Sequence, residues 1–329
     1  MERDRARLNG FARYAWFALG YNLLVILWGV FLRASKSGDG CGQHWLTCHG
    51  EVVPSAPELK TVIEFSHRMM SALDGLVMLV LLVWAVAIWR RTRTAQSRTV
   101  MRLAIGSFIF IITEALVGAG LVLTGNTAET LTPTRPFWMA GHLINTFILL
   151  AFLSLTAWAA SGEGRAPMRF VYERRIVIAA AIGLALILLV GVTGSVAALS
   201  SMIFPSESLS EGLAKDFSAT SNMLLRIRPF HPIVSIAAVM YLVFFSGWLR
   251  KWSDQNGGVV RWSNVLSLLA LVQLVFGGAT LLMLSPIVMQ LGHLLLADLI
   301  WISFVLLTVS YLNAGSRVAV DAPRATAAV

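Results

Sequence analysis

Four of the six histidines in this sequence lie inside long apolar stretches: His67, His142, His231 and His293. Ionisable side chains are costly in such surroundings and mark functional sites by default. One histidine could serve as a hydrogen-bond partner between helices, and a proton relay could use several, but neither explains the repeated pairing. Neutral imidazole binds iron well, and two histidines facing each other across a helix bundle can hold a heme. We therefore expect two heme-iron sites, one between His67 and His142 and one between His231 and His293.

The segment TVIEFSHRMM, residues 61–70, adds a carboxylate to the first histidine pair. Glu64 precedes His67 by three residues, so the two side chains share one face of a helix. A buried carboxylate beside a heme ligand can accept a proton or position a water molecule. The simpler alternative is an ion pair of Glu64 with Arg68 or Arg33.

The second histidine pair has no such carboxylate. The position that matches Glu64 holds Ile227 or Arg228. The position that matches Arg68 holds Pro232. We therefore expect a heme site with added chemistry in the first half and a site that only binds heme in the second.

Eight apolar stretches provide the helices that must position these residues. Of the 329 residues, 57% are hydrophobic and 13% charged, and the mean hydropathy is +0.73. About 20 apolar residues suffice to cross a bilayer. A soluble core of this length could not bury eight such stretches, so we predict an all-α polytopic membrane protein. The expected spans are 14–33, 61–89, 102–124, 137–160, 175–199, 229–250, 262–284 and 287–312, the last two separated by a turn at Ser285 and Pro286.

The positive charge is concentrated in alternate loops. A formal net charge of +9 could suggest nucleic-acid binding, but its distribution follows the positive-inside rule instead. We expect both termini in the cytoplasm, the spans in the lipid of the inner cell membrane, no nucleic-acid partner and no cleaved signal peptide. The basic residues of these loops are Arg3, Arg5, Arg7, Arg13, Arg90, Arg91, Arg93, Arg98, Arg102, Arg165, Arg169, Arg174, Arg175, Arg250, Lys251 and Arg261.

With this topology the two cysteines of the chain face the oxidising side of the membrane. Cys41 and Cys48 lie in the loop between the first two spans, which favours a disulfide or a redox pair over two unrelated thiols. The neighbouring His44 and His49 could complete a Cys/His metal site, although a solvated loop is the simpler expectation for both.

The eight spans divide into two similar sets of four with the same orientation. We predict two four-helix bundles related by a pseudo-twofold axis along the membrane normal. Residues 1–160 would form the N-terminal bundle, 161–175 a cytoplasmic linker and 176–329 the C-terminal bundle. The similar segments are 27–35 and 189–197, 64–78 and 228–240, 114–126 and 271–284, and 139–153 and 289–305.

Glycines occur at related places in the third and seventh spans. They are Gly118, Gly120, Gly277 and Gly278. Small residues allow close packing of membrane helices, and space for a flat ligand is the alternative.

These motifs resemble those of the heme A synthase family. The resemblance rests on EFSHR in span two, GH in spans four and eight, FHP at the start of span six, and C-x6-C with CHG in the first outside loop. It covers residues 11–312. It implies an oxidoreductase that converts the C8 methyl group of heme O into a formyl group by successive hydroxylations, giving heme A for cytochrome c oxidase.

The resemblance also implies roles for individual residues. The N-terminal half would bind the substrate heme O through His67 and His142, with Glu64 as the catalytic residue. The C-terminal half would hold a heme b cofactor through His231 and His293.

Further implications concern the outside loops and the partners. The cysteine pair of the family would fall on Cys41 and Cys48, as a disulfide or as a redox participant. This sequence lacks the second cysteine pair that some members carry in the third outside loop. The implied partners are heme O synthase and the assembly of cytochrome oxidase, and the sequence is compatible with a homo-oligomer.

Two other functions remain open at this point. A cytochrome b that transfers electrons would carry two permanent b hemes, and a transporter or chaperone would exchange heme without converting it. Heme propionates would need cations near the outer ends of the spans, although the same residues could simply anchor helices at the interface. The candidates are Arg33, Lys60, Arg135, Arg226 and Arg228.

Overall fold

The computed structural model describes residues 2–127, 132–161, 173–253 and 255–321, which contain ten helices and no strand. Eight of these helices are long and apolar enough to cross a membrane, which confirms the predicted all-α polytopic membrane protein. The eight are α1 (Glu2–Ala34), α2 (Leu59–Thr92), α3 (Ala95–Leu123), α4 (Arg135–Ala160), α5 (Arg174–Ile203), α8 (Phe230–Lys251), α9 (Gly257–Leu282) and α10 (Ile287–Asp321). Two short helices, α6 (Leu209–Phe217) and α7 (Met223–Ile227), lie between α5 and α8.

Tight turns separate consecutive long helices. Helix α2 ends where Arg93 adopts a left-handed conformation with φ of 53°, and Thr94 caps the first turn of α3. Leu284 and Ser285 are both left-handed, and Pro286 follows them directly before α10 begins. A left-handed residue ends a helix, so the turn predicted at Ser285 and Pro286 divides two separate spans.

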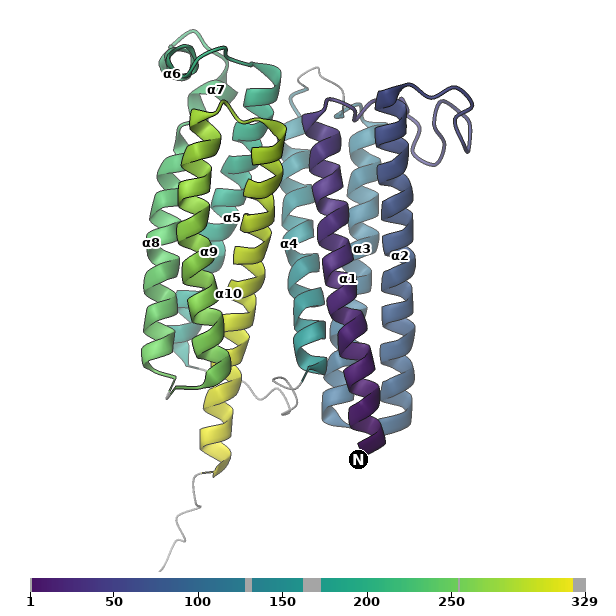
Figure 1. Ribbon diagram of the computed structural model, residues 1–329, viewed down its shortest axis with the longest axis vertical. Coiled ribbons are helices and arrows are strands. Elements are labelled where there is room, and N and C mark those ends of the chain that lie inside the picture. Colours follow the sequence, from purple (N-terminus) through teal and green to yellow (C-terminus); the bar gives the residue numbers. More distant parts are fainter. Residues whose placement is uncertain (1, 128–131, 162–172, 254, 322–329) are drawn as a thin grey trace, which may run out of the picture.

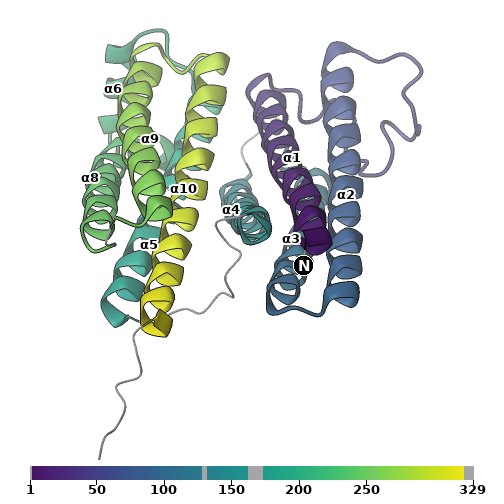
Figure 2. The same cartoon turned by 60° about the horizontal axis from the view of Figure 1, so that its bottom comes forward.

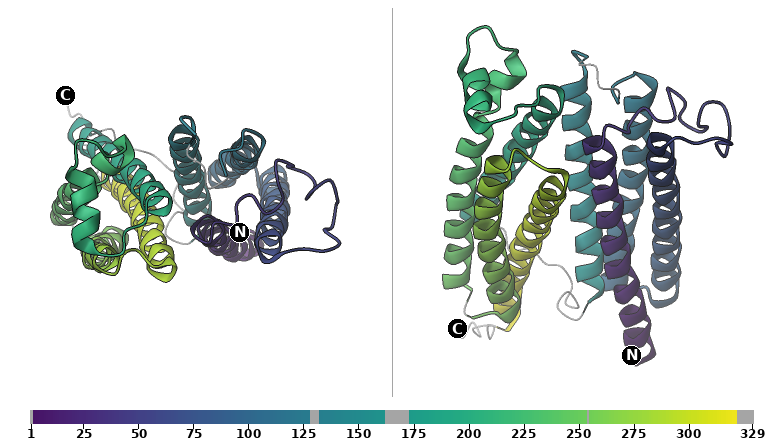
Figure 3. Two further views of the ribbon diagram at one scale, coloured as in Figure 1. Left: turned by 90° about the horizontal axis from the view of Figure 1, so that it is seen from above. Right: turned by 45° about the horizontal axis from the view of Figure 1, so that its top comes forward.

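The long helices form two groups of four. Helices α1 to α4 pack on their neighbours within the first group, and α5, α8, α9 and α10 do so within the second. Seen from above, the two groups lie side by side (Figure 3). A pseudo-twofold axis between the groups stays a prediction. The linker predicted at 161–175 falls largely on residues 162–172, which lie outside the described part of the chain.

Helix α4 lies between the two groups (Figure 2) and contacts α5 and α10 as well as its own neighbours. The indole nitrogen of Trp301 on α10 donates a hydrogen bond of 2.7 Å to the carbonyl of Phe147 on α4. The two rings also stack, with centroids 5.3 Å apart. An aromatic pair with a satisfied polar atom stabilises a close contact, so α4 and α10 form the centre of the molecule.

Helices α2, α4, α8 and α10 all begin at the end of the molecule opposite the start of α1 (Figure 1). The loop between α1 and α2 and the short helices α6 and α7 also lie at this end, which we name the loop end. The start of α1 and the last described turn of α10 both lie at the opposite end.

Candidate functional site

The four predicted histidines lie at one level of the molecule. Each lies within about the first two and a half turns of its helix: His67 in α2, His142 in α4, His231 in α8 and His293 in α10. Those four helices all begin at the loop end (Figure 1). The structure therefore places one pair of histidines in each group of four helices, near the loop end of both.

In the second group the two histidines face each other. The ring centroids of His231 and His293 are 6.3 Å apart, and the ring planes are at 84°. An iron atom bound to an imidazole on each side, with bonds of roughly 2 Å as first-row metals keep to histidine nitrogen, would set the centroids roughly 6 Å apart. This pair therefore has the separation that two ligands of one heme iron require.

Neighbouring helices support both of these rings. Thr193 Oγ1 on α5 lies 3.2 Å from His231 Nδ1. Gln273 Nε2 on α9 lies 3.4 Å from His293 Nε2 and donates a hydrogen bond of 3.0 Å to the His293 carbonyl. Partners of this kind fix the orientation of metal ligands.

Three of the four imidazoles rest against a glycine on the preceding long helix. A Cβ atom added to Gly29 would lie 3.0 Å from His67 Cε1. Cβ atoms added to Gly194 and Gly277 would each lie 2.9 Å from the Cε1 atom of His231 and of His293, respectively. Any larger residue at these positions would displace the ring, so we name Gly29, Gly194 and Gly277 the glycine seats.

The predicted residue-by-residue match between spans one and five is wrong by three residues. Matching 27–35 with 189–197 pairs Gly29 with Gly191, but a Cβ on Gly191 would meet Leu143 of α4 at 2.9 Å. The true counterpart of Gly29 is Gly194, one helical turn later. The two glycines cannot be told apart by sequence, because both fit a pattern of small residues.

His142 differs from the other three histidines. Its side chain is 37% exposed, and Gly118, four residues after Glu114 on α3, has no atom within 4 Å of an added Cβ. The Glu114 Oε1 atom lies 3.5 Å from His142 Nδ1. This approach lacks hydrogen-bond geometry, so Nδ1 has no hydrogen-bond partner. His142 is thus the least constrained of the four rings.

The residues present suit a heme better than a bare metal ion. Within the described ranges, no group of three or more His, Cys, Asp or Glu side chains could hold a metal ion. A porphyrin supplies four nitrogen ligands itself and needs only axial ligands from the protein. Buried ring nitrogens without a hydrogen-bond partner occur in both groups, at Nδ1 of His67 and of His293. His44 and His49 accordingly contribute to no such cluster.

Glu64 is 2% exposed and both of its carboxylate oxygens are occupied. Oε2 accepts a hydrogen bond of 2.8 Å from the backbone N–H of Cys41, and Oε1 forms an ion pair with Arg68. The structure therefore contains the ion pair with Arg68 that the sequence offered as the simpler alternative. It also ties Glu64, and with it the start of α2, to the loop between α1 and α2.

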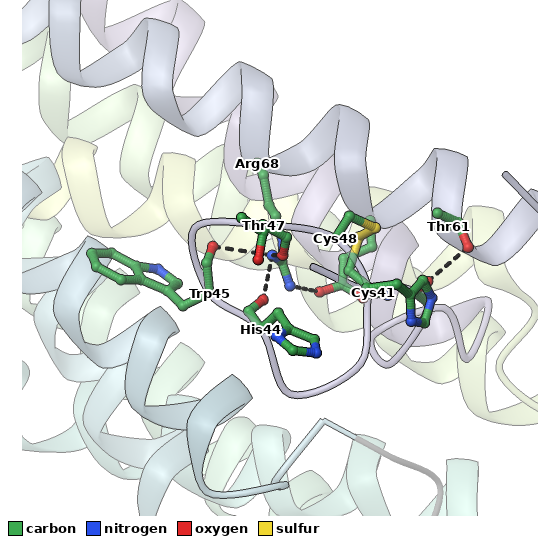
Figure 4. A network of polar contacts seen from close by, with 10 residues as sticks. Cys41, His44, Trp45, Thr47, Cys48, Thr61 and Arg68 are labelled. Carbon is green, nitrogen blue, oxygen red and sulfur yellow. Dashed lines mark hydrogen bonds and ion pairs between the residues drawn. A yellow bond between two sulfur atoms is a disulfide. The ribbon is translucent and has the colours of Figure 1, made fainter. Parts of the chain in front are cut away.

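Arg68 holds the loop between α1 and α2 in place (Figure 4). Its Nη1 atom donates hydrogen bonds to the carbonyls of His44, Trp45 and Thr47 at 2.5, 3.0 and 3.0 Å. The loop is closed by a disulfide between the two cysteines, Cys41 and Cys48, as predicted. Thr61 adds a hydrogen bond of 2.7 Å to the Gly40 carbonyl. The histidine pair of the first group therefore lies beneath a fastened, cross-linked loop.

In the second group, a single arginine holds the short helix α6 in place. Arg228, at the position that matches Glu64, forms an ion pair of 2.7 Å with Asp216 and donates a hydrogen bond of 3.2 Å to the Gly212 carbonyl. Both partners belong to α6. The two sites are covered at the loop end by different chemistry, a carboxylate–arginine–disulfide loop in one group and an arginine–aspartate contact in the other.

The predicted propionate-binding residues have different surroundings. Arg135 at the start of α4 is 3% exposed, and Arg33 near the end of α1 lies close enough to repel it electrostatically. Arg135 is buried and Arg33 is half-buried, and their positive charges, which Asp39 near Arg135 partly offsets, suit binding of a further anion. Lys60 and Arg226 are exposed, and Arg228 is engaged by α6.

A groove of about 470 Å³ opens between α3 and α4 beside His142. Most of its lining is apolar, and its one amide side chain belongs to Asn145, which also donates a hydrogen bond of 2.5 Å to Glu114 Oε2. The lining residues are Val117, Thr134, Phe137, Trp138, Gly141, Ile144, Asn145 and Ile148. The groove therefore lies along an apolar face of α4, and Asn145 is the lining residue that also contacts Glu114.

Sequence reasoning missed Glu114, Asn145 and Thr146. Glu114 is the first residue of the similar segment 114–126, and a carboxylate inside a span is itself an indication of a functional site. Asn145 and Thr146 follow His142 by three and four residues, the spacing that places them on its face of the helix. That spacing could have identified them.

A family model described as COX15-CtaA, cytochrome oxidase assembly protein, matches residues 12–305. A protein of Thermus thermophilus named "Protoheme IX farnesyltransferase" is 39% identical over 306 residues, which cover 93% of this chain and 49% of that protein. A "Heme A synthase" of Halalkalibacterium halodurans is 36% identical over 132 residues, 40% of this chain and 42% of that protein. A "Heme A synthase" of Symbiobacterium thermophilum is 37% identical over 143 residues, 43% of this chain and 42% of that protein. The chain spans about half the length of the curated relatives that it matches.

Proposed function

The chain belongs to the COX15-CtaA family of cytochrome oxidase assembly proteins, and from this premise we propose that it is a heme A synthase. The proposed reaction oxidises the C8 methyl group of heme O to a formyl group. Two successive hydroxylations would each replace one C–H bond by C–OH, each consuming one O2 together with two electrons and two protons from an external donor and releasing one water. Loss of water from the resulting diol would leave the aldehyde. The names of the Halalkalibacterium and Symbiobacterium relatives support this activity.

The observation that carries the proposal is the difference between two histidine pairs at the same level. His231 and His293 are close together, and both rest on glycine seats. His142 is partly exposed, has no glycine against it and is approached by a carboxylate. A permanent cofactor needs a preformed site, whereas a substrate must enter and leave. We therefore assign heme b to His231 and His293.

The substrate heme O is assigned to His67 and His142. Bound heme b would supply one-electron redox chemistry, and the protein would supply binding, orientation and electrostatics. Glu64 is the catalytic residue of the proposal, with a carboxylate that could take up a proton at the oxidised carbon if its contact with Arg68 opens. In the closed arrangement, Glu64 and Arg68 hold the loop over the site and exclude water.

Arg33 and Arg135 are the best candidates for the two propionates of heme O. The two side chains lie near each other at the loop end of the first group, and Arg135 is almost completely buried. Propionates bound there would direct the opposite edge of the porphyrin into the bundle. Arginine is suited to this task because it can bind a carboxylate with two parallel hydrogen bonds.

The groove between α3 and α4 is the proposed entrance. A heme with an apolar tail partitions into the bilayer, so its enzyme would take it up laterally from lipid. The groove has a largely apolar lining and reaches Asn145 next to His142. Entry at this point would bring the substrate to the less constrained histidine.

The proposed partners are the enzyme that makes heme O and the assembly of cytochrome oxidase. A name that refers to protoheme IX farnesyltransferase, printed for the Thermus relative, supports a link with heme farnesylation. The family description supports the link with oxidase assembly. The distribution of basic loops supports an inner-membrane location with the loop end outside and both termini in the cytoplasm.

The test is conversion of heme O in membranes that co-express this chain and a heme O source. Wild-type protein should yield heme A, measured by chromatography of extracted hemes. Glu64→Gln should retain heme b but stop before the aldehyde, and His231→Ala should lose heme b. Full heme A production by Glu64→Gln would remove Glu64 from the chemistry, and absence of any oxidised heme in the wild type would refute the proposed function.

A further inference from the structure

Glu114 is held in position by polar residues of the neighbouring helix. Asn145 Nδ2 donates a hydrogen bond of 2.5 Å to its Oε2 atom, and Thr146 Oγ1 donates one of 2.5 Å to its Oε1 atom. Asn145 is in turn held by the Phe110 carbonyl at 3.0 Å and by Thr113 at 2.7 Å. The side chain of Glu114 is only 17% exposed. Such a network is an organised site rather than a carboxylate reaching for solvent.

The second group of helices lacks this arrangement. Gln273 on α9 occupies the place of Glu114, since each precedes a glycine by four residues and each approaches the histidine of the following long helix. Asn145 and Thr146 follow His142 by three and four residues, and the same places after His293 hold Leu296 and Ala297.

The carboxylate is therefore a specific feature of the first group. Both the negative acceptor and the two donors that hold it are replaced in the second group, by an amide and by two apolar side chains. Coordinated replacement of three contacting residues indicates a difference in function between the histidines that they surround.

We propose that Glu114 is a positioning residue that accepts the Nδ1–H of His142 and so directs the other ring nitrogen to the iron of the substrate heme. This inference rests on the proposed function. It names a carboxylate–histidine–iron arrangement in the substrate site, whereas in the cofactor site the amide nitrogen of Gln273, a donor, lies 3.4 Å from His293 Nε2. A metal-bound histidine normally donates its second ring N–H to such an acceptor, which fixes the tautomer and the ring orientation.

The geometry requires only a small turn of the imidazole. Glu114 Oε1 is already 3.5 Å from His142 Nδ1, and that nitrogen has no hydrogen-bond partner. Thr146 Oγ1 also lies 2.9 Å from the His142 carbonyl, so the hydroxyl that contacts Glu114 belongs to the same helical turn as the ligand.

The chemical consequence is a difference between the two hemes. A carboxylate acceptor makes the imidazole a stronger donor and stabilises ferric over ferrous iron. The amide nitrogen that Gln273 places near His293 is a donor and accepts no ring N–H, so it gives no such stabilisation. Glu114 thus lowers the reduction potential of the substrate heme, while Gln273 leaves that of heme b higher.

The experiment compares purified wild type, Glu114→Gln and Gln273→Glu, each loaded with heme O, in a spectroelectrochemical titration that resolves the two hemes. Glu114→Gln keeps the shape of the side chain and should raise the midpoint potential of heme O alone. Gln273→Glu, the reciprocal variant, should lower the midpoint potential of heme b alone. In addition, Glu114→Ala should weaken heme O binding by about 10- to 100-fold, as loss of such a partner typically does.

The experiment distinguishes failure of the positioning role of Glu114 from failure of the proposed function. If heme O binds and is oxidised but its potential is the same in wild type and Glu114→Gln, the positioning role is refuted and the proposed function stands. If the wild type takes up no heme O, the proposed function fails and the role of Glu114 fails with it.

Discussion

The glycine seats make a sharp prediction for the cofactor site. In Gly277→Ala, the new Cβ would lie 2.9 Å from His293 Cε1, whereas ordinary contacts begin at 3.4 Å. The imidazole must therefore retreat by about 0.5 Å, which equals the tolerance of about 0.5 Å within which a functional site has to hold its ligands. We expect heme b affinity to fall by about 10- to 100-fold, the usual effect of disturbing the support of a metal ligand.

The matched control is the adjacent residue. A Cβ added to Gly278 has no atom within 4 Å, so Gly278→Ala adds the same methyl group to the same helix without touching the histidine. Both variants are purified and titrated with heme b, and binding is followed by the Soret absorbance. The thermal midpoint of the heme-free protein is measured in parallel, because a defect in helix packing would lower it.

The expected result is weak heme binding in Gly277→Ala, wild-type binding in Gly278→Ala, and similar thermal midpoints of the two heme-free variants. Equal heme affinity in Gly277→Ala and wild type would refute the idea that these glycines seat the ligands. A lowered midpoint with unchanged heme affinity would show that Gly277 serves helix packing alone.

Three further predictions concern the first group of helices. Gly29→Ala should weaken binding of heme O but leave heme b in place, whereas Gly118→Ala should bind both hemes normally. Both variants are titrated with each heme. Equal heme O affinity of the two variants would show that Gly29 does not support His67. Arg68→Gln should speed amide hydrogen exchange in the loop 41–48 by about tenfold or more, because a hydrogen bond to a charged group contributes about 1.5–3 kcal/mol; unchanged exchange would mean that the disulfide alone fixes the loop. Gly141→Leu fills the groove beside His142 and should raise KM for heme O in membranes without changing heme b content, and an unaltered KM would argue against entry there.

The sequence was sufficient to predict the architecture because membrane helices follow local rules. Each span needs only enough consecutive apolar residues, and each loop is recognised by its polar and basic side chains. The turn at Ser285 and Pro286, the level of the four histidines and the pairing of Cys41 with Cys48 all followed from such local features.

Contacts between helices could not be predicted in the same way. The choice between Gly191 and Gly194 depends on the rotation of α5 about its axis, which a uniformly apolar span does not reveal. Arg68 fastens a loop more than twenty residues away through backbone carbonyls, which carry no sequence signal. Glu114 can be recognised as part of a site only from the structure, in which α4 places Asn145 against it.

We propose that one chain holds a permanent heme b and a substrate heme in two different histidine sites. The measurement that tests it most directly is acid extraction and chromatography of the hemes from purified protein co-expressed with a heme O source. We predict heme b together with heme O or heme A, and a hydroxylated intermediate between them. Heme b alone, at two per chain, would contradict the account and identify the first site as an electron-transfer heme.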